Sequence, residues 1–250
     1  LNIARRILNE SESVLDEYKH PTINGRLSLY RGLIDFYNSD IGGAISHIEN
    51  SIHQYQSAQK SVPAFNSYLQ LIDIYIFKYQ FDKAKVTVDK IDILVNKIKD
   101  NEILIRYKTI KYLINILDDK VDEKNLNEIV DQLTVENNDM QHYFTYWYLS
   151  LIFSLNNNSK NAEKYLLQSQ KLLIEKSKQD ADKTLWDAIL HTNPINNQII
   201  TQKVGSLKVF TDSLVGKTIK VEVDKFCTEC GYSNMELKPF CPECGSNLKS

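Results

Sequence analysis

The chain has 250 residues, of which 42% are hydrophobic and 25% are charged, and its formal net charge is −2. This composition is that of a folded globular protein and excludes intrinsic disorder. The absence of net positive charge excludes a general basic field for nucleic acid or anionic membranes. Glycine and proline are scarce, with 8 and 5 residues, which favours helices.

Residues 1 to 20 already follow a helical pattern, with Ile3, Ile7 and Leu8 on one face. The chain starts at Leu1 without a methionine, so we expect it to be part of a longer protein. This first helix is predicted to be the second half of a preceding helical unit.

Four segments then share one helical hairpin pattern, in which a small or apolar residue lies early in the second helix. These anchor residues are Ala44, Ala84, Leu126 and Ala162, and they are 40, 42 and 36 residues apart. Further residues that we expect to be buried follow each anchor on the same helix face, as Ile48 and Ser51 do after Ala44. In the first hairpin Gly32 precedes the anchor by 12 residues, where two helices could cross closely.

Turn-forming sequences separate the two helices of the predicted hairpins. They are Asp40-Ile-Gly-Gly, Tyr79-Gln-Phe-Asp and Asn156-Asn-Asn-Ser. Ser61-Val-Pro63 is predicted to divide the first hairpin from the second, because proline disfavours helical geometry in the residue before it.

The spacing of these anchors resembles that of the tetratricopeptide repeat, a family of stacked helical hairpins. The resemblance implies a mainly α fold, a superhelical solenoid in which each hairpin buries its apolar stripe against its neighbours. Two residues depart from the family pattern: Asp35 replaces an aromatic residue, and Leu126 replaces a small one. The alternative is a helical bundle without repeats.

The run from Tyr143 to Leu155 is apolar and aromatic, but it is shorter than the ~20 residues that a membrane span needs. It therefore predicts a buried helix. Residues 183 to 200 are predicted to close the array, with a second turn beginning at Asn193-Pro194. The stretch 190–199 resembles the end of tetratricopeptide arrays in multidomain signalling ATPases and nucleotide cyclases.

After residue 200 the pattern changes from helical to extended. Residues 204–210 predict a strand, and residues 217–226 alternate strictly between apolar and charged side chains, as a half-buried strand does. The predicted domains are therefore a repeat domain at 1–200, a linker or β-hairpin at 201–224, and a separate module at 225–250.

The four cysteines of the chain lie in that last module, as Cys227-x2-Cys230 and Cys241-x2-Cys244. Two such pairs supply the four thiolates of a closed, tetrahedral, structural zinc site. The string around them resembles the zinc ribbon family, a small β module. That resemblance implies one Zn²⁺ held by Cys227, Cys230, Cys241 and Cys244.

Two other interpretations of the cysteines remain open. Four sulfurs also bind iron, and the Cys-Pro-x-Cys-Gly string also resembles rubredoxin, an electron carrier. Two disulfides are the second alternative. They are disfavoured because the chain shows no secretory signal and no earlier cysteine, which indicates a reducing cytoplasm.

No sequence motif points to catalysis. Gly216-Lys217-Thr218 lacks the first glycine of a phosphate-binding loop, and a strand rather than a helix is predicted after it. His47 and His53 fall on different faces of one helix, so we expect surface or packing roles for them. Residues 216–250 hold five lysines and five acids, so the basic surface that nucleic acid requires is missing.

The sequence therefore predicts a non-enzymatic scaffold that binds a protein or peptide on the repeat surface, with a structural zinc ribbon at its end. It is expected to be the regulatory part of a larger cytoplasmic signalling protein, without a membrane partner. A zinc-ribbon factor associated with nucleic acid or transcription is the alternative, and an iron electron carrier is the third hypothesis.

Overall fold

The computed structural model describes residues 2–15, 20–117, 123–135, 142–179, 190–203, 205–207, 211, 225–226 and 233–234. The described part is almost wholly helical. Its elements are α1 (Asn2–Leu15), α2 (Pro21–Tyr37), α3 (Ile41–Ser57), α4 (Ser61–Phe77), α5 (Phe81–Asp92), the 3-10 turn η1 (Val95–Lys97), α6 (Asn101–Leu117), α7 (Glu123–Val135), α8 (Tyr143–Leu155), α9 (Ser159–Ser177), α11 (Pro194–Thr201), β1 (Lys225–Phe226) and β2 (Ser233–Asn234).

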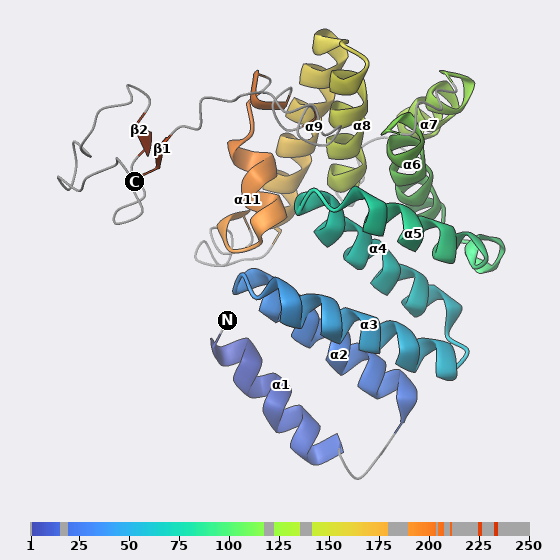
Figure 1. Cartoon of the computed structure of the whole chain (residues 1–250), viewed down its shortest axis with the longest axis vertical. Helices are drawn as coiled ribbons and strands as arrows, with labels where there is room; N and C mark the ends of the chain where they lie inside the picture. Colours follow the sequence, from blue (N-terminus) through green and yellow to red (C-terminus); the bar gives the residue numbers. More distant parts are fainter. Residues whose placement is uncertain are drawn as a thin grey trace.

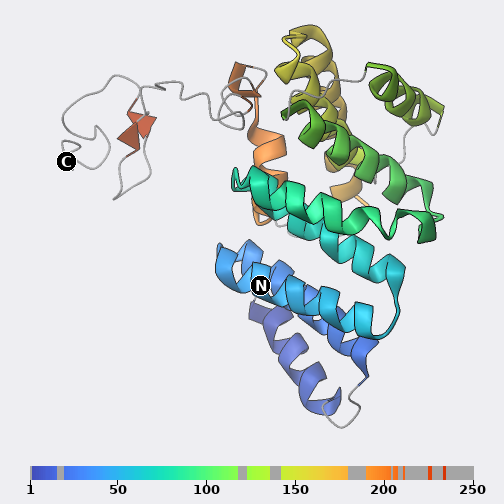
Figure 2. The ribbon, with the colours of Figure 1, turned by 45° about the vertical axis from the view of Figure 1, so that its right-hand side comes forward.

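The helices α2 to α9 form four successive hairpins, and each predicted hairpin is present (Figure 1). Contacts run mainly between neighbours along the chain: α3 packs on α4, α5 on α6, and α6 on α8. The first hairpin lies at one end of the molecule and the fourth at the other, in both views (Figure 2). The sequence pattern therefore predicted the helical hairpins and their order correctly.

The predicted anchor residues lie at the contacts between helices. Ala44, Ala84 and Ala162 are at most 1% exposed, and Leu126 is 6% exposed. A Cβ atom added at Gly32 would lie 2.6 Å from Cγ1 of Ile48 and 3.0 Å from the carbonyl oxygen of Ala44. A side chain at residue 32 would thus push α2 and α3 apart, as the sequence pattern implied.

The residue 12 positions before each anchor is small in two of the four hairpins. Gly32 and Ser150 occupy this position in the first and fourth hairpins, and Ile72 and Ile114 occupy it in the second and third. Among the described residues, the two helices of the first and fourth hairpins share the most extensive contacts.

Three hairpin turns and the link between α3 and α4 share one backbone geometry. Ser39, Gln59, Tyr79 and Asn157 have φ angles of 64°, 55°, 57° and 56°, which place them in the left-handed region. In each turn the N–H of this residue donates to the carbonyl oxygen three positions earlier in the chain. The N–H of the next residue donates to the carbonyl oxygen five positions before it. Such Schellman motifs end helices and usually place glycine at this position.

The role predicted for Pro63 was wrong. Pro63 lies in the first turn of α4, where helix N–H groups have no partner and a proline is tolerated. The chain breaks earlier, at the left-handed Gln59, and α4 begins at Ser61. Pro21 and Pro194 likewise stand at the start of α2 and α11.

The contacts of Asp35 explain why this residue is not the aromatic residue of the repeat pattern. Its carboxylate lies 3.2 Å from Nη2 of Arg5 on α1 and accepts a hydrogen bond from Nδ1 of His47 on α3 at 2.8 Å. An aromatic side chain at this position would provide neither contact. Asp35 thus joins α1 to the first hairpin, in agreement with α1 being the neighbour that precedes it.

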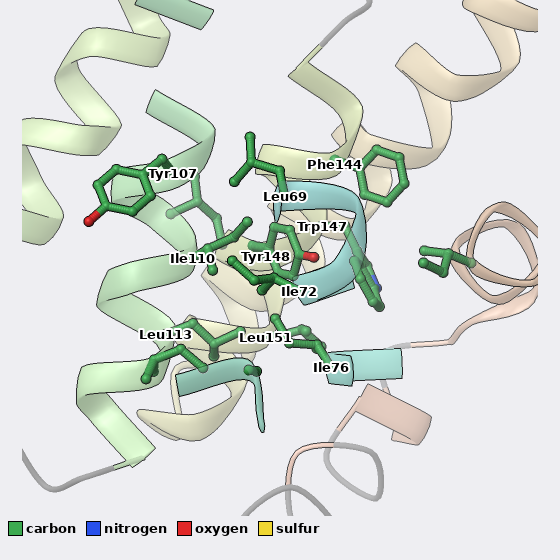
Figure 3. Packing of buried hydrophobic residues seen from close by; sticks show 14 of the residues in the cluster. Leu69, Ile72, Ile76, Tyr107, Ile110, Leu113, Phe144, Trp147, Tyr148 and Leu151 are labelled. Atoms are coloured by element: carbon green, nitrogen blue, oxygen red, sulfur yellow. The ribbon is translucent and has the colours of Figure 1, made fainter. Parts of the chain in front are cut away.

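The main core lies where the first helices of the second, third and fourth hairpins meet. Figure 3 shows side chains of α4, α6 and α8 converging there, including Ile72, Ile110 and Tyr148, all of which are 0% exposed. None of the described helices is both long enough and apolar enough to cross a bilayer. The run from Tyr143 to Leu155 is the buried helix α8, as the sequence predicted.

The segment after α9 covers one side of α8. Pro194 starts α11 as predicted, and Asn193 caps this helix by accepting hydrogen bonds from the N–H groups of Ile195 and Asn196. The indole N–H of Trp147 donates to Oε1 of Gln202 at 2.9 Å. Residues 205–207 form a helical turn, so the strand predicted at 204–210 is wrong there. In this turn Leu207 is 0% exposed, and its N–H and that of Ser206 both donate to the carbonyl oxygen of Lys203.

Candidate functional site

The first helices of all four hairpins border one hollow of about 450 Å³. Leu29 and Leu33 of α2 line one side of it. The other walls consist of Asn66, Leu69 and Gln70 from α4; Asp100, Glu102, Ile103 and Arg106 from the start of α6; Tyr143, Phe144 and Thr145 from α8; and Lys176 from α9. The first and fourth hairpins therefore face the same space. We call this space the central hollow.

Arg106 is the most constrained polar group in the central hollow. Its guanidinium lies 4.7 Å from the centre of the Phe144 ring, and its Nη2 donates to Oδ2 of Asp73. Asp73 also accepts a hydrogen bond from the hydroxyl of Tyr148. The Asp73 side chain is 1% exposed and that of Arg106 is 18% exposed. A buried acid on α4 thus holds a cation on α6 against an aromatic ring on α8.

Burial controls the ionisation of this cluster. Loss of water raises the pKa of the Asp73 carboxyl, although the positive charge of Arg106 and the hydrogen bond from Tyr148 act in the opposite direction. Burial also raises the pKa of the Tyr148 hydroxyl well above its ordinary value, and the charge of Asp73 adds to this rise. Tyr148 is therefore held neutral and serves Asp73 as a hydrogen-bond donor.

Not every N–H group of the Arg106 guanidinium has a hydrogen-bond acceptor in the described part of the protein. Its Nε–H is buried and has no hydrogen-bond partner in the described part of the chain. An unpaired buried donor costs free energy, of the order of 1–3 kcal/mol.

A second hollow, of about 470 Å³, lies between α3 and α5 with α4 as its floor. Two of its polar side chains have partners: Nε2 of Gln56 donates to the hydroxyl of Tyr68 at 3.1 Å, and the amine of Lys83 lies 5.7 Å from the centre of the Tyr75 ring. It is bordered by a single hairpin and one helix of its neighbour, and we regard the central hollow as the stronger site.

All four predicted metal ligands, Cys227, Cys230, Cys241 and Cys244, lie outside the described residues. Within the described residues, no group of three or more His, Cys, Asp or Glu side chains could hold a metal ion. The two short strands beside the first cysteine pair are described. Lys225 pairs with Asn234 and Phe226 with Ser233 in antiparallel fashion. These two strands precede and follow Cys227 and Cys230 in the sequence.

The sequence did not predict the central hollow. Asp73, Arg106 and Tyr148 are separated by 33 and 42 residues along the chain, and nothing in their spacing links them. A single signal was present: Asp73 stands in the most apolar part of α4, where a charged residue requires a partner. His47 and His53 were correctly assigned to packing and surface roles, since His47 contacts Asp35 and His53 is exposed.

The chain matches no protein-family model, no curated protein and no solved structure. The case for function therefore rests on the residues of the chain itself.

Proposed function

We propose that this protein is a non-enzymatic scaffold that binds another protein or a peptide in the central hollow. The observation that carries the proposal is the convergence of four first helices on one hollow that is lined by both apolar and polar side chains. Hairpin arrays are suited to this role because stacking repeats create extended binding surfaces. The cluster of Asp73 and Tyr148 lies beneath Arg106, so we assign it to positioning rather than to acid–base chemistry.

We propose that the helical part is a tetratricopeptide-like array. The regular spacing of the buried anchors, the small residues at two of the four helix crossings and the shared turn geometry all support this class. The looser second and third hairpins are irregular members of such an array. We further propose that the array is the regulatory part of a larger signalling protein.

The C-terminal module is proposed to be a structural zinc ribbon, with Cys227, Cys230, Cys241 and Cys244 holding one Zn²⁺. Four thiolates are a donor set that fits zinc, and the strand pair supports a hairpin around the first cysteine pair. The metal would supply folding energy to a module too small to bury a core. Thiolates persist only in a reducing compartment. We therefore also propose that the protein is located in the cytoplasm.

Elemental analysis of purified protein tests the metal. We expect about one zinc per chain, since four thiolates close one tetrahedral site. A red protein that contains iron at that ratio would instead establish the rubredoxin-like site, and a metal-free protein with two disulfides would refute both metal hypotheses.

Site-specific photocrosslinking tests the scaffold function. A benzoylphenylalanine replaces Lys176, at the rim of the central hollow, in the full chain inside cells that produce it. The matched control carries the same group at Asn127, an exposed residue of α7 that does not border the hollow. We expect a discrete adduct from residue 176 that is absent from residue 127. Equal labelling at both positions, or labelling at neither, would refute a partner in the central hollow.

A further inference from the structure

Helix α11 lies between the first and the fourth hairpins. One of its ends is next to the turn that joins α2 to α3 in both views (Figure 1 and Figure 2), and α11 packs along α9. Among the described elements, the first hairpin otherwise makes extensive contacts only with α1 and α4. Helix α11 is therefore placed to connect the two ends of the array.

The contact of α11 with the first hairpin is made by Tyr37, the last residue of α2. Burial raises the pKa of the Tyr37 hydroxyl, and a hydrogen bond with the side chain of Asn193 acts in the opposite direction. An N–H donor has this effect, because it favours the ionised phenol. Oδ1 of Asn193 already accepts from two main-chain N–H groups of α11, so Nδ2 remains as the donor to Tyr37. One side chain thus caps α11 and ties it to α2.

The contacts of α11 with the fourth hairpin are more extensive. Nε2 of Gln170 on α9 donates to the carbonyl oxygens of Ile199 and Gln202 at 2.9 and 3.0 Å. The indole N–H of Trp147 on α8 donates to the side chain of Gln202, and Ile199 is fully buried. Helix α11 is therefore held more firmly by the fourth hairpin than by the first, and the contact with Tyr37 is the one that opens more readily.

This junction lies at the edge of the central hollow. Burial raises the pKa of Tyr143 at the start of α8, a charge on Tyr37 would raise it further, and a hydrogen bond with Asn196 of α11 lowers it. The two tyrosines of the first and fourth hairpins and the strap helix between them are thus near neighbours. Tyr143 also lines the central hollow, and Leu33 of α2 lines its opposite side. The contact at Tyr37 therefore bears on the distance between the two walls.

We propose that α11 is a strap that holds the first and fourth hairpins together and so sets the width of the central hollow. When the contact between Asn193 and Tyr37 is lost, the first hairpin moves away from the fourth at the link between α3 and α4. Helix α11 stays on the fourth hairpin, because the contacts with α8 and α9 remain. The wall formed by α2 then separates from the walls formed by α8 and α9, and the hollow opens. This device goes beyond the proposed scaffold function and operates without a partner.

Pulsed electron double resonance on the full chain measures the separation of the two hairpins. The spin labels are attached to p-acetylphenylalanine at residues 46 and 163, which are exposed positions of α3 and α9, because labelling at cysteine would also modify the four native cysteines. We expect a single narrow distance distribution for the otherwise unchanged chain. Tyr37→Ala removes the contact with the strap and should broaden this distribution and shift it to longer distances.

Tyr30→Ala is the matched control. It removes a tyrosine from the same helix at a position that is 49% exposed, and it should leave the distance distribution unchanged. Tyr37→Phe keeps the ring and removes only the hydroxyl, so it should produce a smaller shift in the same direction. Circular dichroism at 222 nm verifies that each variant remains helical, and Tyr37→Phe decides the question if Tyr37→Ala loses helicity.

Two outcomes would overturn the inference. If both Tyr37 variants keep the original distance distribution, the stacked hairpins hold their own separation and α11 is not a strap. If Tyr30→Ala shifts the distribution as much as Tyr37→Ala does, the change is a general loosening of α2. Either result leaves the scaffold function standing, since that function is tested separately by photocrosslinking at residue 176.

Discussion

Asp73 places a carboxylate in the core. The free-energy cost of removing this carboxylate from water is offset by interactions with residues of two other helices. Arg106 supplies the opposite charge and Tyr148 supplies a hydrogen bond. Removing one partner of such a buried pair is far more costly than replacing both with apolar residues, because the remaining charge is left without compensation. The cluster therefore fixes the alignment of α4, α6 and α8 more than it adds stability.

We predict that Asp73→Ala lowers the free energy of unfolding by about 3–5 kcal/mol, the cost of leaving a buried charge unpaired. The double variant Asp73→Leu, Arg106→Met should recover most of this loss. Urea denaturation of Asp73→Leu, of Arg106→Met and of the double variant completes a double-mutant cycle, and Asp73→Ala is measured beside them. If the single and double variants are equally destabilised, the two side chains are not coupled and our interpretation of the cluster is incorrect.

At the scale of the elements, helix ends and helix crossings decide the geometry of the array. The left-handed residues that end four helices are Ser39, Gln59, Tyr79 and Asn157, none of which is glycine. A residue with a Cβ atom pays about 1–2 kcal/mol for this conformation. The sequence gives no glycine signal at these turns, and they form because helix packing on either side fixes the chain.

Gln59→Gly should stabilise the protein by about 1 kcal/mol, since relief of left-handed strain exceeds the added freedom of glycine in the unfolded chain. For a chain of this size the melting temperature should rise by about 2–4 °C. Ser46→Gly, at an exposed position inside α3, is the control and should lower stability by roughly 0.5 kcal/mol. Differential scanning calorimetry measures both, and a destabilising effect of Gln59→Gly would contradict the strain argument.

Helix crossing depends on Gly32. Gly32→Ala should cost about 1–3 kcal/mol, because the new Cβ atom meets the backbone of Ala44 as well as Ile48. Gly42→Ala is the matched control: its nearest contact would be Oδ1 of Asp40 at 3.8 Å, so it should stabilise α3 by roughly 0.5–1 kcal/mol through helix propensity. Chemical denaturation should therefore give opposite signs for the two changes. Equal effects would mean that α2 and α3 do not cross closely at this residue.

At the scale of the whole molecule, the helical array and the cysteine module should fold independently. The array has a core of its own, formed by α2 to α9 and α11. The cysteine module is too short for such a core, and in the zinc-ribbon proposal the metal supplies its folding energy.

Chelation of the metal, or Cys241→Ser, should leave helical circular dichroism at 222 nm almost unchanged. Hydrogen exchange should rise only after about residue 216, in the strand predicted at 217–226 and in the cysteine module at 225–250. Loss of most helicity on chelation would show that the array needs the metal module. Chelation of the Cys241→Ser variant is the control, since it should cause no further change.

Buried tyrosines make the array sensitive to high pH. Burial raises the pKa of Tyr143 and Tyr148 in the folded protein, whereas in the unfolded chain the phenols ionise near pH 10. A raised pKa means that the folded state retains protons that the unfolded state loses. Stability is therefore complete below about pH 10 and falls as the pH rises above it.

Titration monitored at 295 nm should thus show two classes of tyrosine. Exposed tyrosines should ionise reversibly near pH 10, and the buried ones only together with loss of the signal at 222 nm. In 6 M guanidinium all tyrosines should titrate in one step. If all of them titrate in one reversible step in the native protein, the core described around α8 is wrong.

The sequence alone determined the helical hairpins, and the cysteine module stays a prediction from the sequence. Apolar periodicity specifies which face of each helix is buried. Small residues such as Gly32 and Ala44 specify where two helices can approach. Both features can be recognised in short stretches of the sequence. Only the tertiary structure decided the central hollow and the partners of Asp73. Arg106 and Tyr148 meet Asp73 because α4, α6 and α8 pack together in the core. How these helices pack depends on the side-chain sizes at each of their contacts, and no local sequence pattern contains that information.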